Sequence, residues 1–394
     1  MLADTIKNIK PSATLSISQK ANRLKQDGHP VISLSVGESD FPTPPHVIEA
    51  AKKAMDNGET RYTAVAGTRP LRQAICDHLS QQYEYSYTPE QILVSNGAKQ
   101  VLFNAFQATL NPGDEVIIPA PYWVSYPPMV KINKGHPVIV DCLQEQDLLL
   151  TPGQLEKAIT PRTKWVVLNS PSNPSGATYT KAQLQALGDV LLKYPHVWVM
   201  VDEIYDRIVY LEEGFTSFLQ ACPKLKERTL LINGVSKSYA MTGWRIGFGA
   251  GPQELIEGMS RLQSQSTSGA CSISQAAALA AYSGEQSYLA HQCTSFKKRR
   301  DLVVTAINNI PGLKAPAPMG AFYMLVDCRD SLKKLGLTDD VALCDLLLDE
   351  ANIALVPGSA FGAPGFVRLS YALDDATLQA AMARLKEALF PPTG

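Results

Sequence analysis

The chain has 394 residues, of which 45% are hydrophobic and 19% are charged, and its formal net charge is -1. This length exceeds the size at which one hydrophobic core usually stops growing, so we expect a large domain and a smaller one. The composition excludes a disordered protein. The balanced charge gives no basic face for nucleic acid or an anionic membrane, so the expected partner is a small molecule.

The N-terminal segment, residues 1–14, is polar and lacks the apolar stretch of a signal peptide. No run along the chain approaches the ~18 apolar residues of a membrane span. We therefore expect a cytoplasmic protein. The seven cysteines form no C-x-x-C pair and no repeated spacing, which argues against zinc and against disulfides. We expect them to be buried thiols, and we expect no metal.

Short apolar runs alternate with helix-length segments through the middle of the chain. The runs are residues 92–94, 115–118, 165–168, 197–201, 230–232 and 246–249, and the segments between them include the expected helices 99–110, 181–193 and 253–263. Runs this short and without polar alternation are typical of buried strands in a parallel sheet. The pattern predicts an α/β domain in which helices flank a mostly parallel sheet.

After about residue 283 the pattern changes. A long helix is expected through 295–310, followed by a stretch at 320–327, a helix around 340–351, a strand at 367–370 and a closing helix from 374. We predict a large domain over residues 46–283 and a small α+β domain made of residues 1–45 and 284–394.

Polar and reactive residues follow the predicted strands. In an open parallel sheet, ligands bind beyond the carboxyl ends of the strands. Gly97 and Ala98 open a helix after the first run, where free backbone N–H groups and the helix dipole favour a phosphate. The residues that follow the later runs are Trp123, Asn173, Asp202, Tyr205, Lys237 and Arg245.

Each of these residues is a weak indicator alone, because a lysine after a strand is usually just a solvated charge. As a set they match one ligand. An aldehyde-bearing pyridine phosphate needs an aromatic ring to stack on, a carboxylate, a hydroxyl, an amide, an anion-binding helix start and a lysine that forms a Schiff base. The set predicts pyridoxal 5'-phosphate (PLP) as cofactor.

Residues 236–247, Ser-Lys-Ser-Tyr-Ala-Met-Thr-Gly-Trp-Arg-Ile-Gly, resemble the cofactor-lysine signature of fold-type I PLP enzymes, the class I and II aminotransferases. Segments 120–126, 173–176, 202–205 and 367–371 match the family pattern in order. The resemblance runs from about residue 10 to the last helix and is greatest to the bacterial aspartate and aspartate/prephenate aminotransferases. It implies a homodimer that transfers an amino group, with L-aspartate as expected donor and 2-oxoglutarate as acceptor, by a ping-pong mechanism.

The resemblance also implies catalytic roles. Lys237 would bind PLP covalently and then, displaced by the substrate amine, move the α-proton. Asp202 would pair with the pyridine nitrogen and keep it protonated. Tyr205 and Asn173 would donate hydrogen bonds to the ring 3-oxygen. The ordinary alternatives are a surface lysine, a helix-capping aspartate and a turn asparagine.

Further cofactor contacts follow from the same resemblance. Trp123 would stack on the pyridine face, and the ordinary alternative is a core aromatic. Arg245 would bind the phosphate together with the backbone of Gly97 and Ala98. Tyr62 would reach the phosphate of a neighbouring subunit, which places the expected active sites at a dimer interface.

The substrate contacts are expected at Arg368 and Gly37, beside Trp123 and Asn173. Arg368 would bind the substrate α-carboxylate through a bidentate pair, and Gly37 would let the backbone approach the same group. In the aspartate and prephenate branch, a lysine after the phosphate turn and a threonine in a Lys-Pro-Ser-Ala-Thr segment meet the distal carboxylate. Lys99 and Thr14 occupy these positions here, the latter within residues 10–14.

The sequence departs from the family pattern at three places. Ala98 replaces a glycine, Ser39 replaces a proline, and Phe366 lies close before Arg368. Ala98 still supplies its N–H, so phosphate binding should survive, whereas the other two leave the exact substrate open.

Three other functions are alternatives to an aspartate aminotransferase. A nicotinamide enzyme fails on spacing, because Pro252 stands where residues 247–251 would require the third glycine of a G-x-G-x-x-G motif. A prephenate or aromatic amino acid aminotransferase would use the same chemistry. A PLP-dependent carbon-sulfur lyase would use the same lysine with a different pocket, and Lys99 and Thr14 favour transamination over it.

Overall fold

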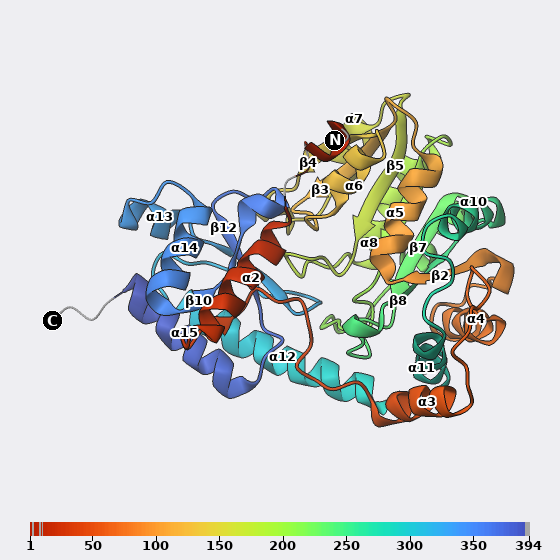
Figure 1. The fold of residues 1–394 in the computed structure, drawn as a ribbon. Coiled ribbons are helices and arrows are strands. Elements are labelled where there is room, and N and C mark those ends of the chain that lie inside the picture. Colours follow the sequence, from red (N-terminus) through yellow and green to blue (C-terminus); the bar gives the residue numbers. More distant parts are fainter. Residues whose placement is uncertain (2–3, 8, 10, 391–394) are drawn as a thin grey trace.

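The computed structural model describes residues 1, 4–7, 9 and 11–390 (Figure 1). Within them, a seven-stranded sheet has the order β2-β8-β7-β6-β5-β3-β4. Its strands are β2 (Ile92–Asn96), β3 (Glu115–Ala120), β4 (His136–Asp141), β5 (Thr163–Asn169), β6 (Trp198–Asp202), β7 (Thr229–Gly234) and β8 (Ile246–Ala250). Neighbours are parallel except around β8, which is antiparallel to β2 and β7. The predicted mostly parallel sheet is confirmed.

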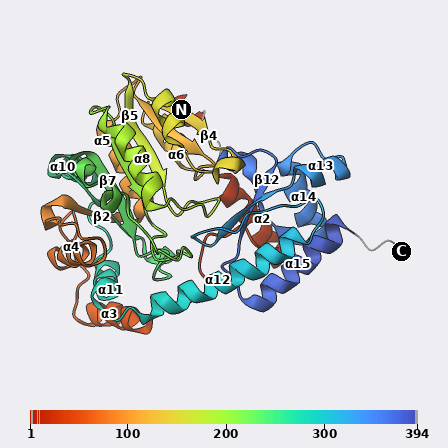
Figure 2. The same cartoon turned by 180° about the vertical axis from the view of Figure 1, so that it is seen from behind.

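Helices cover both faces of this sheet (Figures 1 and 2). Val166 of β5 packs in the layer that includes α8, whereas its neighbours Trp165 and Val167 pack in the layer that includes α5. Burial on both faces explains why the strands are continuously apolar. The helices of this part are α3 (Pro45–Asp56), α4 (Arg69–Tyr83), α5 (Ala98–Thr109), α6 (Tyr126–Ile132), α7 (Pro152–Ala158), α8 (Lys181–Leu192), α9 (Phe218–Ala221), α10 (Gln253–Ser264) and α11 (Ser272–Ser283).

A second part combines the two ends of the chain. Strands β11 (Val356–Pro357), β12 (Phe366–Ser370) and β9 (Tyr323–Asp327) form an antiparallel sheet, and β1 (Ile32–Ser33) pairs in parallel with β10 (Ile353–Ala354). The helices are α1 (Asp4–Lys7), α2 (Ala13–Gln26), α12 (Ser287–Asn308), α13 (Arg329–Leu335), α14 (Asp340–Ala351) and α15 (Asp375–Leu389). The domain boundaries at residues 45/46 and 283/284 stay predictions.

Short 3-10 helices connect several of these elements. They are η1 (Pro89–Gln91), η2 (Gln144–Gln146), η3 (Pro223–Arg228), η4 (Thr242–Trp244) and η5 (Gly358–Phe361). The helices α7 and α8 each begin at a capping box, formed by Thr151 with Gln154 and by Thr180 with Gln183. In each box the threonine hydroxyl and the glutamine side chain satisfy backbone N–H groups that the first helical turn leaves unpaired.

The cysteines differ in one respect from expectation. All seven are free thiols, and five are buried. Cys293 is only partly buried, and Cys271 is exposed at the start of α11, so the expectation of buried thiols was wrong for Cys271. Among the described residues, no helix is both long and apolar enough to cross a membrane.

Candidate active site

A cleft of about 550 Å³ opens where the carboxyl ends of the sheet strands meet the N- and C-terminal parts of the chain. This volume lies in the range of small-molecule binding sites. The cleft brings together most of the residues expected at the site: Thr14, Gly37, Ala98, Lys99, Trp123, Asn173, Asp202, Tyr205, Lys237, Arg245 and Arg368. Gly97 adjoins the cleft through Arg245, and Tyr62 lies outside it.

The start of α5 and Arg245 form an anion-binding corner. Gly97 precedes the helix with φ of +83°, and a Cβ there would lie 2.5 Å from Nη2 of Arg245. The positive φ favours glycine at this position, and a Cβ there would also displace the guanidinium. Arg245 donates to the carbonyl oxygens of Thr242 (2.8 Å) and Asn96 (3.2 Å), which holds its charge beside the helix N-terminus. The corner fits a phosphate group.

Asp202 ends β6 as a buried carboxylate. Its Oδ2 accepts a 2.7 Å hydrogen bond from the hydroxyl of Tyr126, and the side-chain amide of Asn169 donates to its backbone oxygen at 2.9 Å. Burial raises the pKa of Asp202 to about 6, although the Tyr126 hydrogen bond opposes the rise. A cationic partner would relieve the cost of burying this charge, so the carboxylate fits a protonated pyridine nitrogen.

Lys237 follows β7 and reaches across the cleft. Its Nζ donates a 2.6 Å hydrogen bond to the backbone oxygen of Gly37. Burial lowers the pKa of Lys237 to about 8; Glu38 opposes this change, and Arg368 and Arg245 add to it. A lysine with a lowered pKa is more often neutral near pH 7, which suits both attack on an aldehyde and proton transfer.

Arg368 lies in the middle of β12 and is only 2% exposed. Its Nη1 donates to Oδ1 of Asn173 (3.0 Å) and its Nη2 to the backbone oxygen of Ser35 (2.6 Å). The guanidinium carbon lies 4.6 Å and 5.0 Å from the ring centres of Tyr323 and Phe361. Among the described residues, its buried Nε has no hydrogen-bond partner. An oriented guanidinium with an unsatisfied donor fits a carboxylate.

The amide of Asn173 is oriented by its neighbours. Its Oδ1 accepts from Arg368, and its backbone N–H donates to Oδ1 of Asn169 at 2.9 Å. The hydrogen bond from Arg368 to Oδ1 fixes the orientation of the amide, which leaves Nδ2 as a donor for a ligand oxygen. Asn173 therefore joins Arg368 to the part of the cleft that its own amide faces.

A second cationic position lies at the Trp123 side of the cleft. Lys99 Nζ lies 4.7 Å from the ring centre of Trp123. Burial lowers the pKa of Lys99, and the Arg245 cation lowers it further. Thr14 Oγ1 is buried and has no hydrogen-bond partner among the described residues. Lys10, which begins the same predicted segment, lies outside the described residues.

Tyr62 is 99% exposed and lies in the segment between α3 and α4. It does not line the cleft of its own chain, and its expected role in a neighbouring subunit stays a prediction.

Two tyrosines that contribute to the site were missed from the sequence. Tyr126 lies in a segment that matched the family pattern, but its contact with Asp202 was not foreseen. The Tyr323 hydroxyl lies 3.0 Å from that of Tyr205. A useful signal for Tyr126 was its position three residues after Trp123 at a strand end; no local signal indicated Tyr323.

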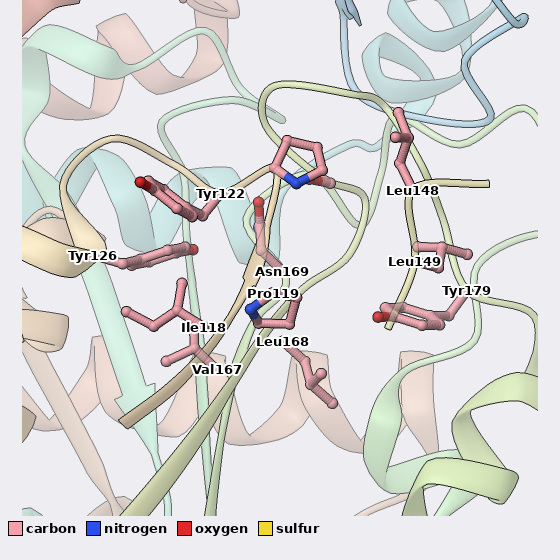
Figure 3. Close-up of a pocket in the computed structure, with 12 residues that line it drawn as sticks. Ile118, Pro119, Tyr122, Tyr126, Leu148, Leu149, Val167, Leu168, Asn169 and Tyr179 are labelled. Carbon is pink, nitrogen blue, oxygen red and sulfur yellow. The ribbon is translucent and has the colours of Figure 1, made fainter. Parts of the chain in front are cut away.

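Figure 3 shows the residues that line a second, smaller cavity, among them Tyr126, Tyr122 and Ile118. Its volume is about 30 Å³, which suffices for about one water molecule. The cofactor and the substrate therefore require the large cleft. There the anion-binding corner, the buried carboxylate, the lysine and the stacking ring together fit PLP.

Comparison with known proteins agrees with this geometry. The profile of the family described as aminotransferase class I and II matches residues 29–385. The aspartate/prephenate aminotransferase of Cereibacter sphaeroides is 50% identical over 390 residues, which cover 98% of each chain. The aspartate aminotransferase of Rhizobium meliloti is 49% identical over 391 residues, which cover 98% of this chain and 95% of the relative.

Solved structures give the same result. The aspartate aminotransferase of Rhizobium meliloti superposes with a TM-score of 0.95 at 48% identity, covering 99% of this chain and 98% of the other. The Thermus thermophilus enzyme, solved with maleate, superposes with a TM-score of 0.93 at 40% identity, covering 98% and 99%. The chain belongs to the class I and II aminotransferases, fold-type I enzymes that depend on PLP.

Proposed function

We propose that this aminotransferase takes the amino group from a dicarboxylic amino acid, L-aspartate, and passes it to 2-oxoglutarate by a ping-pong mechanism. The observation that carries the proposal is a cleft with two separate cationic positions, Arg368 on β12 and Lys99 on α5. Aspartate and 2-oxoglutarate each carry two carboxylates, so both substrates can use both positions. The named relatives above are aspartate or aspartate/prephenate aminotransferases, which supports the same choice.

In the proposed mechanism, Arg368 binds the α-carboxylate and so orients the Cα–H bond. Lys99 and Thr14 bind the distal carboxylate. Bound PLP supplies an electron sink for the negative charge that develops on the α-carbon. Lys237 would take up the α-proton on its Nζ and give it back to the cofactor side of the substrate nitrogen, and Asp202 would pair with the ring nitrogen and keep it protonated.

The remaining cofactor contacts are proposed from the same geometry. Trp123 would stack on the ring, Asn173 and Tyr205 would donate to the ring oxygen, and Arg245 with the start of α5 would bind the phosphate. Gly37 accepts a hydrogen bond from Lys237 and therefore sits beside the reacting atoms.

Aromatic 2-oxo acids and prephenate form a second candidate substrate class. Leu15, Val36 and Leu102 line the cleft beside the charged groups. Leu15 is 62% exposed and Val36 is 36% exposed. Apolar surface of this kind would favour a ring in the space that aspartate leaves unfilled.

We also propose that the enzyme is a cytoplasmic homodimer. Tyr62 is 99% exposed and does not line the cleft of its own chain, so its ring is free to reach the site of a neighbouring subunit. Arg245 also borders an open cavity of about 400 Å³ beside α5, where a partner's side chain could approach the phosphate corner. Sedimentation equilibrium would test the dimer, and a monomer with full activity would contradict it.

The substrate proposal is tested by half-reactions without an acceptor. The purified PLP enzyme is mixed in turn with L-aspartate, L-glutamate, L-alanine, L-phenylalanine and L-cysteine while its visible absorption is followed. Aspartate should convert the cofactor to its aminated form faster than alanine does, and 2-oxoglutarate should restore the original band. If aspartate leaves the band unchanged while cysteine yields pyruvate and sulfide, the enzyme is a carbon-sulfur lyase and the proposed pocket is wrong.

A further inference from the structure

Tyr323, the first residue of β9, lies at the centre of the proposed site. Its side chain is 1% exposed and lines the cleft. Its hydroxyl lies 3.0 Å from the hydroxyl of Tyr205, and either oxygen can be the donor. The same ring lies 4.6 Å from the guanidinium carbon of Arg368. One side chain thus contacts both the proposed carboxylate site and the proposed ligand of the cofactor oxygen.

The sheet register explains why Tyr323 and Arg368 meet. Strands β9 and β12 are antiparallel, with Tyr323 opposite Ser370 and Leu325 opposite Arg368. Tyr323 and Arg368 are therefore diagonal neighbours on the same face of the sheet, within reach of long side chains. This pairing places the ring of Tyr323 against the guanidinium.

Gly37 makes room for the hydroxyl. A Cβ at this position would collide with Oη of Tyr323. The backbone oxygen of Gly37 also accepts the hydrogen bond from Lys237. The Tyr323 hydroxyl therefore lies beside the loop that contacts the proposed cofactor lysine as well as beside Tyr205.

We propose that Tyr323 is a positioning residue whose ring holds Arg368 for the substrate carboxylate and whose hydroxyl supports the hydrogen bond that Tyr205 donates to the cofactor, so that carboxylate binding and proton release at Lys237 are coupled. This inference rests on the proposed function, because it takes from it the roles of Arg368, Tyr205 and Lys237.

The coupling has a physical basis in the hydrogen-bond chain. When Tyr323 donates to the oxygen of Tyr205, the proton of Tyr205 becomes a better donor to the ring oxygen of the cofactor. That donation stabilises negative charge on the ring oxygen of the cofactor. The proton that this oxygen shares with the Lys237 nitrogen therefore dissociates at lower pH. A carboxylate on Arg368 compensates the cation beside the Tyr323 ring, which weakens the chain and raises the pH at which this proton leaves.

The experiment compares Tyr323→Phe and Tyr323→Leu with the wild-type holoenzyme. A matched control is Tyr371→Phe, because Tyr371 is also fully buried in the C-terminal part and its hydroxyl donates to the backbone oxygen of Ala321 at 3.1 Å, but it does not line the cleft. The primary measurement is the pH midpoint of the visible absorption change of resting enzyme, with and without maleate as a dicarboxylate probe. Aspartate kinetics give KM and kcat separately.

Tyr323→Phe should raise the midpoint in the absence of maleate by about 0.5 pH units, the size of one neutral hydrogen bond. Maleate should then shift the midpoint less than it does in the wild type. The KM for aspartate should stay within about threefold, since the ring remains against Arg368. Tyr323→Leu should raise KM on the order of tenfold because the ring is lost. Tyr371→Phe should leave the midpoint and the maleate shift unchanged.

The outcomes distinguish a failure of the proposed function from a failure of the role proposed for Tyr323. If the wild type itself shows no midpoint, or none that maleate shifts, the proposed cofactor and carboxylate sites fail. If the wild type shows both but Tyr323→Phe has the same midpoint and the same maleate shift, the coupling role of Tyr323 is refuted while the proposed function stands. Equal shifts in Tyr371→Phe would also refute it, because general loosening of the core would then be sufficient.

Discussion

Lys99→Met tests whether the cleft selects a second carboxylate. Methionine keeps an apolar side chain that can pack against Trp123. It removes the Lys99 cation, whose Nζ lies 4.7 Å from the ring centre of Trp123. A hydrogen bond to a charged group contributes about 1.5–3 kcal/mol, so kcat/KM for L-aspartate should fall roughly 10- to 150-fold. L-Alanine lacks the distal carboxylate, and its kcat/KM should change less than about threefold.

The assay follows single half-reactions of both amino acids by stopped-flow absorption. Lys131→Met serves as the control, since Lys131 is an exposed lysine in the last turn of α6 and is not a lining residue of the cleft. Equal losses for aspartate and alanine would mean that Lys99 supports the cofactor and not the distal carboxylate. If kcat/KM stayed unchanged for both substrates, Lys99 would not bind the distal carboxylate, and the proposed choice of a dicarboxylic substrate would be contradicted.

Arg368→Lys should lower kcat/KM for every amino acid on the order of 100-fold, because a lysine cannot form the bidentate pair that a guanidinium makes with a carboxylate. A loss confined to dicarboxylic amino acids would contradict this role of Arg368. Asp202→Asn should lower kcat on the order of 100-fold or more and weaken cofactor retention on dialysis, and an unchanged kcat would be inconsistent with pairing to the ring nitrogen. Burial raises the pKa of Glu203 from 4.5 to about 8, so the stability gained from its protonated form is present below pH 4.5 and lost as pH rises through 8. Glu203→Gln should therefore flatten the pH dependence of the unfolding temperature between these values. A profile as steep as that of the wild type would show that the raised pKa of Glu203 is not its cause.

The strands that bear the site could be predicted from the sequence because their burial on both faces leaves continuous apolar runs. β4 could not, because it lies at the edge of the sheet, where none of its residues is fully buried. Its sequence, His-Pro-Val-Ile-Val-Asp, begins and ends with polar residues. An edge strand with one open side lacks the signal that identified its neighbours.

Residues beside strand ends were also accessible to sequence reasoning, since a parallel sheet gathers them at one edge. Asp202 and Lys237 belong to this class. Tyr323 does not, because it reaches the cleft from the start of a strand in the C-terminal part through the pairing of β9 with β12. Such contacts depend on how distant segments pack, and no local periodicity records them.

The first residues of two helices also differ from those predicted from the sequence. The helix expected from residue 99 begins at Ala98, directly after Gly97 with its positive φ. The helix expected through 295–310 begins at Ser287, eight residues earlier. Its first two turns carry a polar face toward solvent, which weakened the apolar pattern there. Backbone geometry at Gly97 and polar exposure before residue 295 account for these two differences.

The most direct test of the account is the chemical location of the cofactor. The PLP enzyme is reduced with sodium borohydride, digested, and searched by mass spectrometry for the lysine that carries the pyridoxyl group. We expect the pyridoxyl group on Lys237, and we expect no pyridoxyl-lysine in a Lys237→Ala variant treated in the same way. Modification of another lysine in the wild type, or stable cofactor attachment in the variant, would contradict the assignment of this cleft as the active site.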